Sequence, residues 1–167
     1  MKNKHKDAAF DEVPLRGFFR LKVVEKNGEV TKVVGDSGWQ KNQVTNLGKD
    51  QYLSQLLAGM AGSKQVTYAA LGTGTAPGAA DTSLNGELTD VAGCRCAVTP
   101  TTVNALGTVQ FAFTLNSNVI TAAKTIQNVG LFNTSTTATG TIFAGNTYTT
   151  SALATNQAVN GSYQIRF

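Results

Sequence analysis

The sequence lacks several features on which large classes of function depend. It has one histidine, His5, and two cysteines in 167 residues, and no apolar run long enough for a membrane-spanning helix, which needs about 18 residues. A nucleophilic triad requires a base close to the nucleophile, so a histidine-based triad is not expected. No apolar stretch of a signal peptide follows the first residues, MKNKHKDAAFDEV, and we therefore expect folding in a cytoplasm, with no membrane partner.

Charge is also scarce in the second half of the chain. Residues 1–50 contain ten Lys or Arg and seven Asp or Glu, whereas residues 97–167 contain two charged side chains, Lys124 and Arg166. Valine, phenylalanine, leucine and isoleucine alternate there with threonine, serine and asparagine, which is typical of a folded segment and not of a disordered one. Lone proteins generally keep charge on their surface, so this neutral exterior indicates contacts with neighbouring subunits.

The N-terminal part divides into an arm and a hairpin. Residues 1–15 combine lysines and acids with little apolar content, and we expect a flexible arm. In RGFFRLKVVEKNGEVTKVV, residues 16–34, two β-prone runs flank Asn27-Gly28, a pair that predicts a β-hairpin because both residues accept positive φ. Residues 16–167 are the length of one domain.

One helix and many short strands are predicted beyond the hairpin. Residues 46–60 have helical apolar spacing at Leu53, Leu56, Leu57 and Met60, with Thr45 or Asn46 as the N-cap. Six short segments follow between turn residues: VTYAALG, CRCAVTP, TVQFAFTL, TIQNVGLF, GTIFAGNTYT and AVNGSYQIRF. This pattern predicts a mainly β protein, an antiparallel β-sandwich or jelly roll with one short helix and the N-terminal arm.

A glycine-rich stretch, YAALGTGTAPGAADTSLNGEL, raises the possibility of a phosphate-binding loop. Its Gly72, Gly74 and Gly78 follow the pattern G-x-G-x-x-x-G, and no lysine comes after the last glycine. Both a Walker loop and a dinucleotide fingerprint require other spacings. The stretch therefore predicts a turn, and no cofactor is expected.

The remaining chemical groups favour structural roles. Asp81, Glu87 and Asp90 could form a hydrolytic pair, but turn residues around them favour carboxylates that accept hydrogen bonds from backbone amides. Cys94 and Cys96 lie on one side of a predicted strand and cannot complete a zinc site alone, so we expect buried thiols, with an intersubunit disulfide as the alternative. We expect no enzymatic activity and no metal.

Nucleic acid is not an expected partner despite the sequence pI of about 9.2. The lysines of the hairpin alternate with Glu25, Glu29 and Asp36, so no basic stripe forms.

Three pieces of sequence, in order, resemble structural proteins of tailed bacteriophages. They are NQVTNLGKDQYLSQLLAG, YAALGTGTAPGAADTSLNGEL, and TIQNVGLFN followed by GTIFAGNTY. Similar strings occur in the N-terminal regions of tail-collar fibre proteins and in small virion proteins of β-sandwich type. The resemblance spans about residues 42–150 and implies a non-enzymatic virion protein that is made in the host cytoplasm.

The resemblance also suggests where in the virion the protein acts. The sequence closes on SYQIRF without the repetitive shaft of a fibre, and so looks more like a head decoration or cement protein. By family likeness, such a protein binds the major capsid protein and often forms a homotrimer. A tail adaptor or fibre-attachment protein, which binds tail proteins, is the alternative.

Partner-binding residues are predicted in and beside the arm. Phe10, Phe18, Phe19 and Arg20 combine aromatic rings with an arginine, a composition typical of interface anchors. Neighbouring strand residues face opposite ways, so at least one of Phe18 and Phe19 should instead lie in the core. A further alternative is a carbohydrate- or host-binding sandwich, for which Trp39, Tyr148 and Tyr163 are the candidate aromatic side chains.

Overall fold

The computed structural model describes residues 15–27, 30–90, 94–102 and 107–167. The predicted hairpin is confirmed, with β1 (Arg16–Asn27) antiparallel to β2 (Val30–Asp36). Asn27 pairs with Val30, so the connection consists of residues 28 and 29, one position later than the predicted Asn27-Gly28 turn. Of the predicted arm, residues 1–14 lie outside the described part of the chain.

The described residues form a ten-stranded antiparallel sheet. Its order is β5-β4-β8-β9-β3-β1-β10-β7-β6, and β2 is paired to β1. The remaining strands are β3 (Gln40–Val44), β4 (Tyr68–Gly72), β5 (Arg95–Ala97), β6 (Thr99–Thr102), β7 (Thr108–Leu115), β8 (Lys124–Phe132), β9 (Ile142–Leu153) and β10 (Ala158–Arg166).

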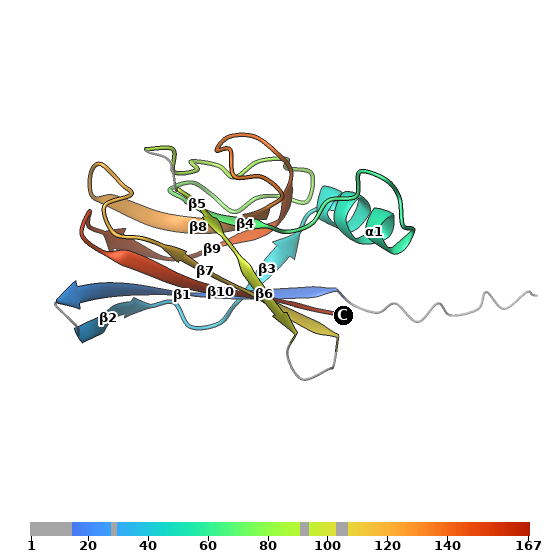
Figure 1. Cartoon of the computed structure of the whole chain (residues 1–167). Coiled ribbons are helices and arrows are strands. Elements are labelled where there is room, and N and C mark those ends of the chain that lie inside the picture. Colours follow the sequence, from blue (N-terminus) through green and yellow to red (C-terminus); the bar gives the residue numbers. More distant parts are fainter. Residues whose placement is uncertain (1–14, 28–29, 91–93, 103–106) are drawn as a thin grey trace, which may run out of the picture.

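The sheet folds into two facing layers, which confirms the predicted mainly β, antiparallel class. In Figure 1 the layer with β5, β4, β8 and β9 lies above the layer with β1, β10 and β7. Strand β3 pairs with both β9 and β1 and so joins the layers on one side. On the other side β5 and β6 are separated by Val98 alone, although β5 pairs with β4 and β6 with β7. The layers are therefore connected along both sides.

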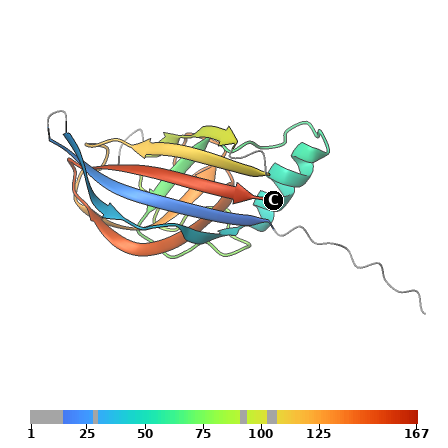
Figure 2. The ribbon, with the colours of Figure 1, turned by 90° about the horizontal axis from the view of Figure 1, so that it is seen from below.

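The core lies between these layers, where the alternating residues of each strand meet. Phe111, Phe113 and Leu115 of β7 are buried, as are Tyr163 and Ile165 of β10, in agreement with the predicted alternation. Strands β1, β10 and β7 lie side by side in Figure 2. Their inward side chains thus form one apolar surface.

The predicted helix is present but short. Residues 46–57 are helical, as a π-helical segment η1 (Gly48–Ser54) followed by α1 (Gln55–Leu57). The Thr45 hydroxyl oxygen accepts a hydrogen bond from the Gly48 N–H at 3.0 Å, which confirms Thr45 as the capping side chain. Tyr52 is the buried anchor of the helix, whereas Leu56 and Met60 are 48% and 55% exposed. Helical spacing therefore placed the helix correctly but not its buried face.

Two buried tyrosines provide a matched test of the core. Tyr163 has no exposed surface, and its hydroxyl has no hydrogen-bond partner among the described residues, whereas the Tyr52 hydroxyl donates to the carbonyl oxygen of Thr141. An unsatisfied buried hydroxyl costs about 1–3 kcal/mol. We expect Tyr163→Phe to leave the free energy of unfolding unchanged or to raise it, and Tyr52→Phe to lower it by about 1 kcal/mol. Urea denaturation followed by circular dichroism measures both, and a marked loss in Tyr163→Phe would contradict the assignment.

Candidate docking surface

The structure places the four predicted partner-binding residues in different environments. Phe10 lies outside the described residues. Phe19 is completely buried between the rings of Tyr148 and Tyr163, at centroid distances of 5.9 and 6.1 Å, so the prediction that it docks a partner is wrong. Its position in β1 sends its side chain into the core and those of its neighbours outward.

Phe18 and Arg20 lie on the outer side of β1, and each already has an intramolecular contact. The Arg166 guanidinium lies over the Phe18 ring, 4.8 Å from its centroid. Arg20 forms a bidentate pair with Asp36, with N–O distances of 2.8 and 2.5 Å. This contact holds β2 against β1, and the partner-binding role of Phe18 and Arg20 stays a prediction.

The Arg20–Asp36 pair predicts a pH dependence of stability. Hydrogen bonding to Arg20, assisted by the Gly38 backbone N–H, lowers the pKa of Asp36 from 3.8 to about 2. Because the folded-state pKa is depressed, the contribution to stability is present above the unfolded-state pKa and is lost as the pH falls from about 4 toward 2. We expect the stability difference between wild type and Asp36→Asn to shrink on acidification from pH about 5 to about 2.5. Urea midpoints at both pH values test this, and a pH-independent difference would contradict it.

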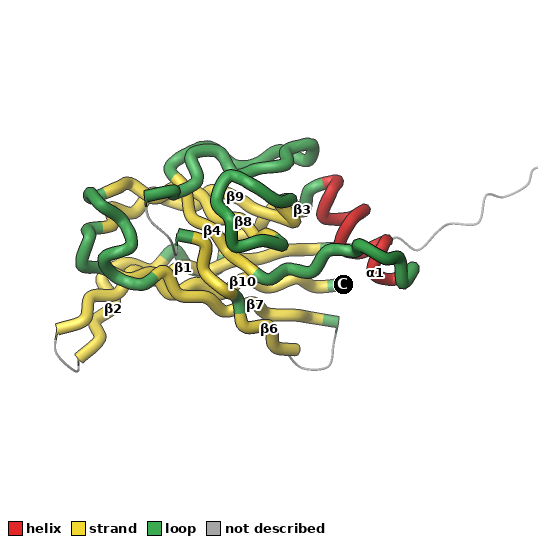
Figure 3. Tube along the Cα trace, turned by 45° about the horizontal axis from the view of Figure 1, so that its top comes forward, coloured by secondary structure: helices red, strands yellow, loops and turns green. Residues whose placement is uncertain are grey.

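An apolar groove opens where the helix meets the end of the lower layer. Its volume is about 290 Å³, and its walls include Tyr52 and Leu56 from the helix, Val109 and Phe111 from β7, and Ile165 and Phe167 at the end of the chain. Leu56 and Phe167 are 48% and 54% exposed. Figure 3 shows the helix beside the C-terminus. This site is called the apolar groove below.

The start of β1 lies next to the apolar groove. Arg16 pairs with Arg166 and Gly17 with Ile165, so Leu15 comes directly beside the C-terminal residues that line the groove. Leu15 also packs against the main core cluster. The predicted arm is therefore attached at the same end of the molecule as the exposed Leu56 and Phe167.

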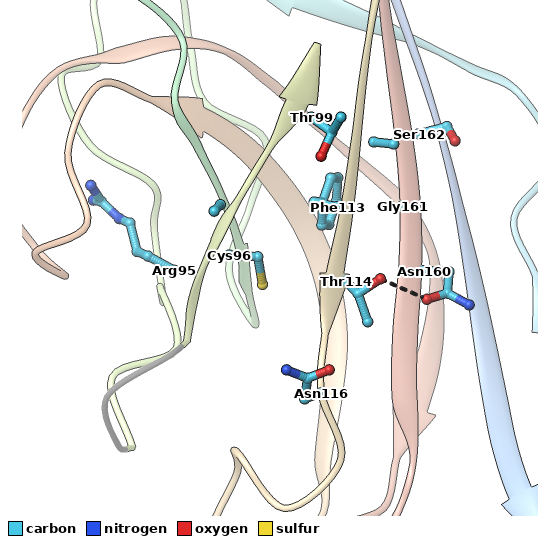
Figure 4. A pocket seen from close by; sticks show the side chains of 11 residues that line it. Arg95, Cys96, Thr99, Phe113, Thr114, Asn116, Asn160, Gly161 and Ser162 are labelled. Atoms are coloured by element: carbon cyan, nitrogen blue, oxygen red, sulfur yellow. Dashed lines mark hydrogen bonds between the residues drawn. The ribbon is translucent and has the colours of Figure 1, made fainter. Parts of the chain in front are cut away.

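A second, polar hollow of about 610 Å³ lies between β5, β6, β7 and β10 (Figure 4). Its lining side chains include Thr99, Thr114, Asn116, Asn160 and Ser162, and the Thr114 hydroxyl donates to the Asn160 side-chain oxygen at 2.9 Å. The aromatic ring in its lining belongs to Phe113, which is buried over Gly161. A sugar would thus find hydrogen-bonding groups there but no exposed stacking surface among these lining residues.

The three aromatic candidates for carbohydrate binding are not equivalent. Tyr163 is wholly buried, so the prediction that it contacts a ligand is wrong. Tyr148 packs edge-on against Phe19, and burial raises its pKa. Trp39 is 44% exposed and remains as a possible stacking residue. A single exposed ring on a loop gives the carbohydrate alternative little support.

The acidic residues 81, 87 and 90 each have a separate structural partner. The predicted hydrogen bond from a backbone amide is the contact of Asp81, whereas Glu87 and Asp90 pair with basic side chains. Asp81 accepts a hydrogen bond from the Gly78 N–H at 2.8 Å. Asp90 pairs with Lys124 at 2.8 Å, and this side chain lowers the Asp90 pKa. Glu87 binds the buried Arg95 through both carboxylate oxygens, at 2.6 and 3.0 Å. These contacts occupy the carboxylates that a hydrolytic pair would use.

The glycine-rich stretch forms a packed loop, in agreement with the predicted turn. The Thr73 N–H donates to the Gly86 carbonyl at 2.9 Å, and the buried Asn128 amide donates to the carbonyls of Thr75 and Asn85. A Cβ at Gly74 would come within 2.4 Å of the Asn85 carbonyl oxygen. The close contact between the segments around residues 74 and 85 thus requires glycine at position 74. Phosphate binding is not needed to explain this glycine.

Both cysteine side chains are buried, which confirms the predicted buried thiols. Burial raises the pKa of Cys96 to about 12. In the described part of the chain, no group of three or more histidine, cysteine or acidic side chains is arranged to hold a metal ion, and no helix is both long and apolar enough to cross a membrane.

Comparison with known proteins identified no relative of this chain. No protein-family model, curated protein or solved structure matches this chain.

Proposed function

We propose that this protein is a non-enzymatic structural component of a tailed bacteriophage virion, a capsid decoration protein that binds the head lattice as an oligomer. The observation that carries the proposal is the apolar groove, with exposed Leu56 and Phe167, at the end of the molecule where the N-terminal arm begins. Exposed apolar side chains that gather at one site are typical of a protein interface.

The rest of the surface suits a protein held among many neighbours. Residues 97–167 have two charged side chains, and the exposed strand β6 is built from threonine and proline. Removing a hydroxyl or amide group from water in a contact costs less free energy than removing a charged group. The two layers, joined along both sides, provide a rigid block. The resemblance of three ordered sequence pieces to phage structural proteins supports the same assignment.

The first experiment adds labelled protein separately to isolated heads and isolated tails that lack the native protein, and counts bound copies. Saturation of heads at tens to hundreds of copies is the expected result. A few copies bound to tails alone would instead support the tail-adaptor alternative, and binding to neither would reject a virion role. The molar mass of the free protein from light scattering reports whether it is an oligomer.

Matched variants then test the docking surface. We expect Leu56→Ser with Phe167→Ser to reduce head occupancy at least tenfold, because both exposed side chains line the apolar groove. The control is Val33→Ser with Val34→Ser, since these residues are 49% and 42% exposed on β2, at the other end of the molecule (Figure 1). Equal occupancy of the two double variants would contradict docking through the groove.

A further inference from the structure

The apolar groove has the composition of a site for one apolar side chain on a short peptide. Ten of the twelve residues that line it are aliphatic, aromatic or proline. The other two are Gln65 and Lys64, which is the one charged residue among them. Lys64 is held at the groove by a hydrogen bond of 2.6 Å to the Gln51 side chain. An occupant should therefore combine an apolar side chain with a neighbouring negative charge.

We propose that the groove binds residues 8–10 of the same chain, Ala8-Ala9-Phe10, with the Phe10 ring in the groove. These residues are the one apolar stretch between the first residue and Glu12, and Asp7 and Asp11 flank them. The flanking carboxylates complement Lys64, the charged side chain in the groove lining. The inference rests on the groove and the sequence. In the free protein the arm then covers the surface proposed above for docking, and a partner that docks there displaces Phe10.

The point of attachment favours this occupant. Leu15 packs on the core beside the C-terminal residues of the groove, and it lies five positions after Phe10 in the sequence. An extended tether of this length reaches at most about 17 Å, at about 3.3 Å per residue. A short flexible tether gives an effective concentration in the millimolar range, which exceeds the concentration of second copies in a dilute solution. The chain's own arm therefore has the advantage over the arm of another copy.

A disulfide trap in the full chain tests the inference. Phe10→Cys combined with Leu56→Cys, oxidised with copper phenanthroline at low protein concentration, should give a disulfide within one chain. The native Cys94 and Cys96 are buried and do not compete. The matched control, Phe10→Cys with Val33→Cys, places the second thiol on β2, at the end of the molecule away from the helix. Mass spectrometry of unreduced peptides identifies each linkage.

The outcomes separate the possible occupants. A predominant linkage within one chain, at least five times that of the control, supports the inference. Linkage mainly between chains would show that the groove takes the arm of a second copy, and would overturn it. Linkage no greater than in the control would also overturn it.

A variant without new cysteines provides an independent readout. Phe10→Ala should uncover the groove and raise the fluorescence of an apolar dye several-fold, while Phe10→Leu keeps the groove covered. Equal dye binding by wild type, Phe10→Ala and Phe10→Leu would contradict the proposal. Neither measurement involves phage particles, so failure here is distinguishable from failure of the virion assignment.

Discussion

Arg95→Met should lower the free energy of unfolding by about 3–5 kcal/mol, the range measured when one partner of a buried ion pair is removed. The side chains of Arg95 and Glu87 are 1% and 5% exposed, with a shortest N–O distance of 2.6 Å. Methionine fills much of the same space but leaves the Glu87 carboxylate buried without its counter-charge. For a domain of this size the midpoint of thermal unfolding should fall by about 6 to 20 °C.

Arg95 also joins parts of the chain that are distant in sequence. Its guanidinium donates to the carbonyls of Thr134 and Thr139, both at 2.9 Å, and lies 3.7 Å from the centre of the Phe132 ring. Loss of the guanidinium therefore frees two carbonyl groups of the loop between β8 and β9, in addition to the carboxylate. For this reason we expect Arg95→Met to lower the free energy of unfolding by more than most single substitutions do.

The double variant Arg95→Met with Glu87→Gln separates charge from packing. It removes both charges, so we expect it to be more stable than Arg95→Met alone. The exposed pair provides a control, since Arg20→Met breaks a bidentate contact whose side chains are 35% and 31% exposed. We expect a much smaller effect there than at Arg95. Equal losses at the two arginines, measured by urea denaturation, would contradict the assigned role of burial.

Gly48→Ala should destabilise the protein by about 2–3 kcal/mol, although alanine is favoured over glycine in a helix by about 1 kcal/mol. A Cβ at this position would lie 2.1 Å from the carbonyl oxygen of Phe143, a backbone atom that cannot rotate away. The same oxygen accepts hydrogen bonds from the Thr45 N–H and hydroxyl, at 3.0 and 2.9 Å. Relief of the clash would therefore pull the start of the helix away from β9.

The direction of the stability change in Gly48→Ala distinguishes two explanations. Helix propensity by itself predicts stabilisation, whereas the close contact with β9 predicts destabilisation. Gly35→Ala is the control, because its Cβ would meet the Val23 side chain at 3.5 Å, an ordinary contact. We expect little change in the urea midpoint for Gly35→Ala and a clear decrease for Gly48→Ala. An increase for Gly48→Ala would show that the helix packs differently.

Local patterns in the sequence were sufficient for some of these features. The helix cap and the β1–β2 hairpin depend on groups within a few residues of one another. Adjacent residue types predicted the hairpin and narrowed the cap to Thr45 or Asn46, of which the structure shows Thr45. The alternation of apolar with polar residues likewise predicted strands with one buried face, which β7 shows at Phe111, Phe113 and Leu115. The predicted arm and the partner-binding role of Phe10 fall outside the described residues and stay predictions.

Other features depend on contacts between distant segments, which the sequence does not specify. The choice between Phe18 and Phe19 as the core residue depended on which face of β1 the upper layer covers. The apolar spacing of the helix could not show that Leu56 and Met60 stay exposed, because burial requires a neighbouring element on that side.

The sequence by itself therefore determined the class of the fold, since a period of two residues and turn signals act over short distances. The tertiary structure alone decided that Arg95 meets Glu87, that Gly48 meets the Phe143 carbonyl, and that β1 begins beside an open apolar groove. These contacts join segments whose proximity is set by the order and register of the strands. Many strands with the same alternation could pair with one another equally well, and the packing of the whole core selects one arrangement.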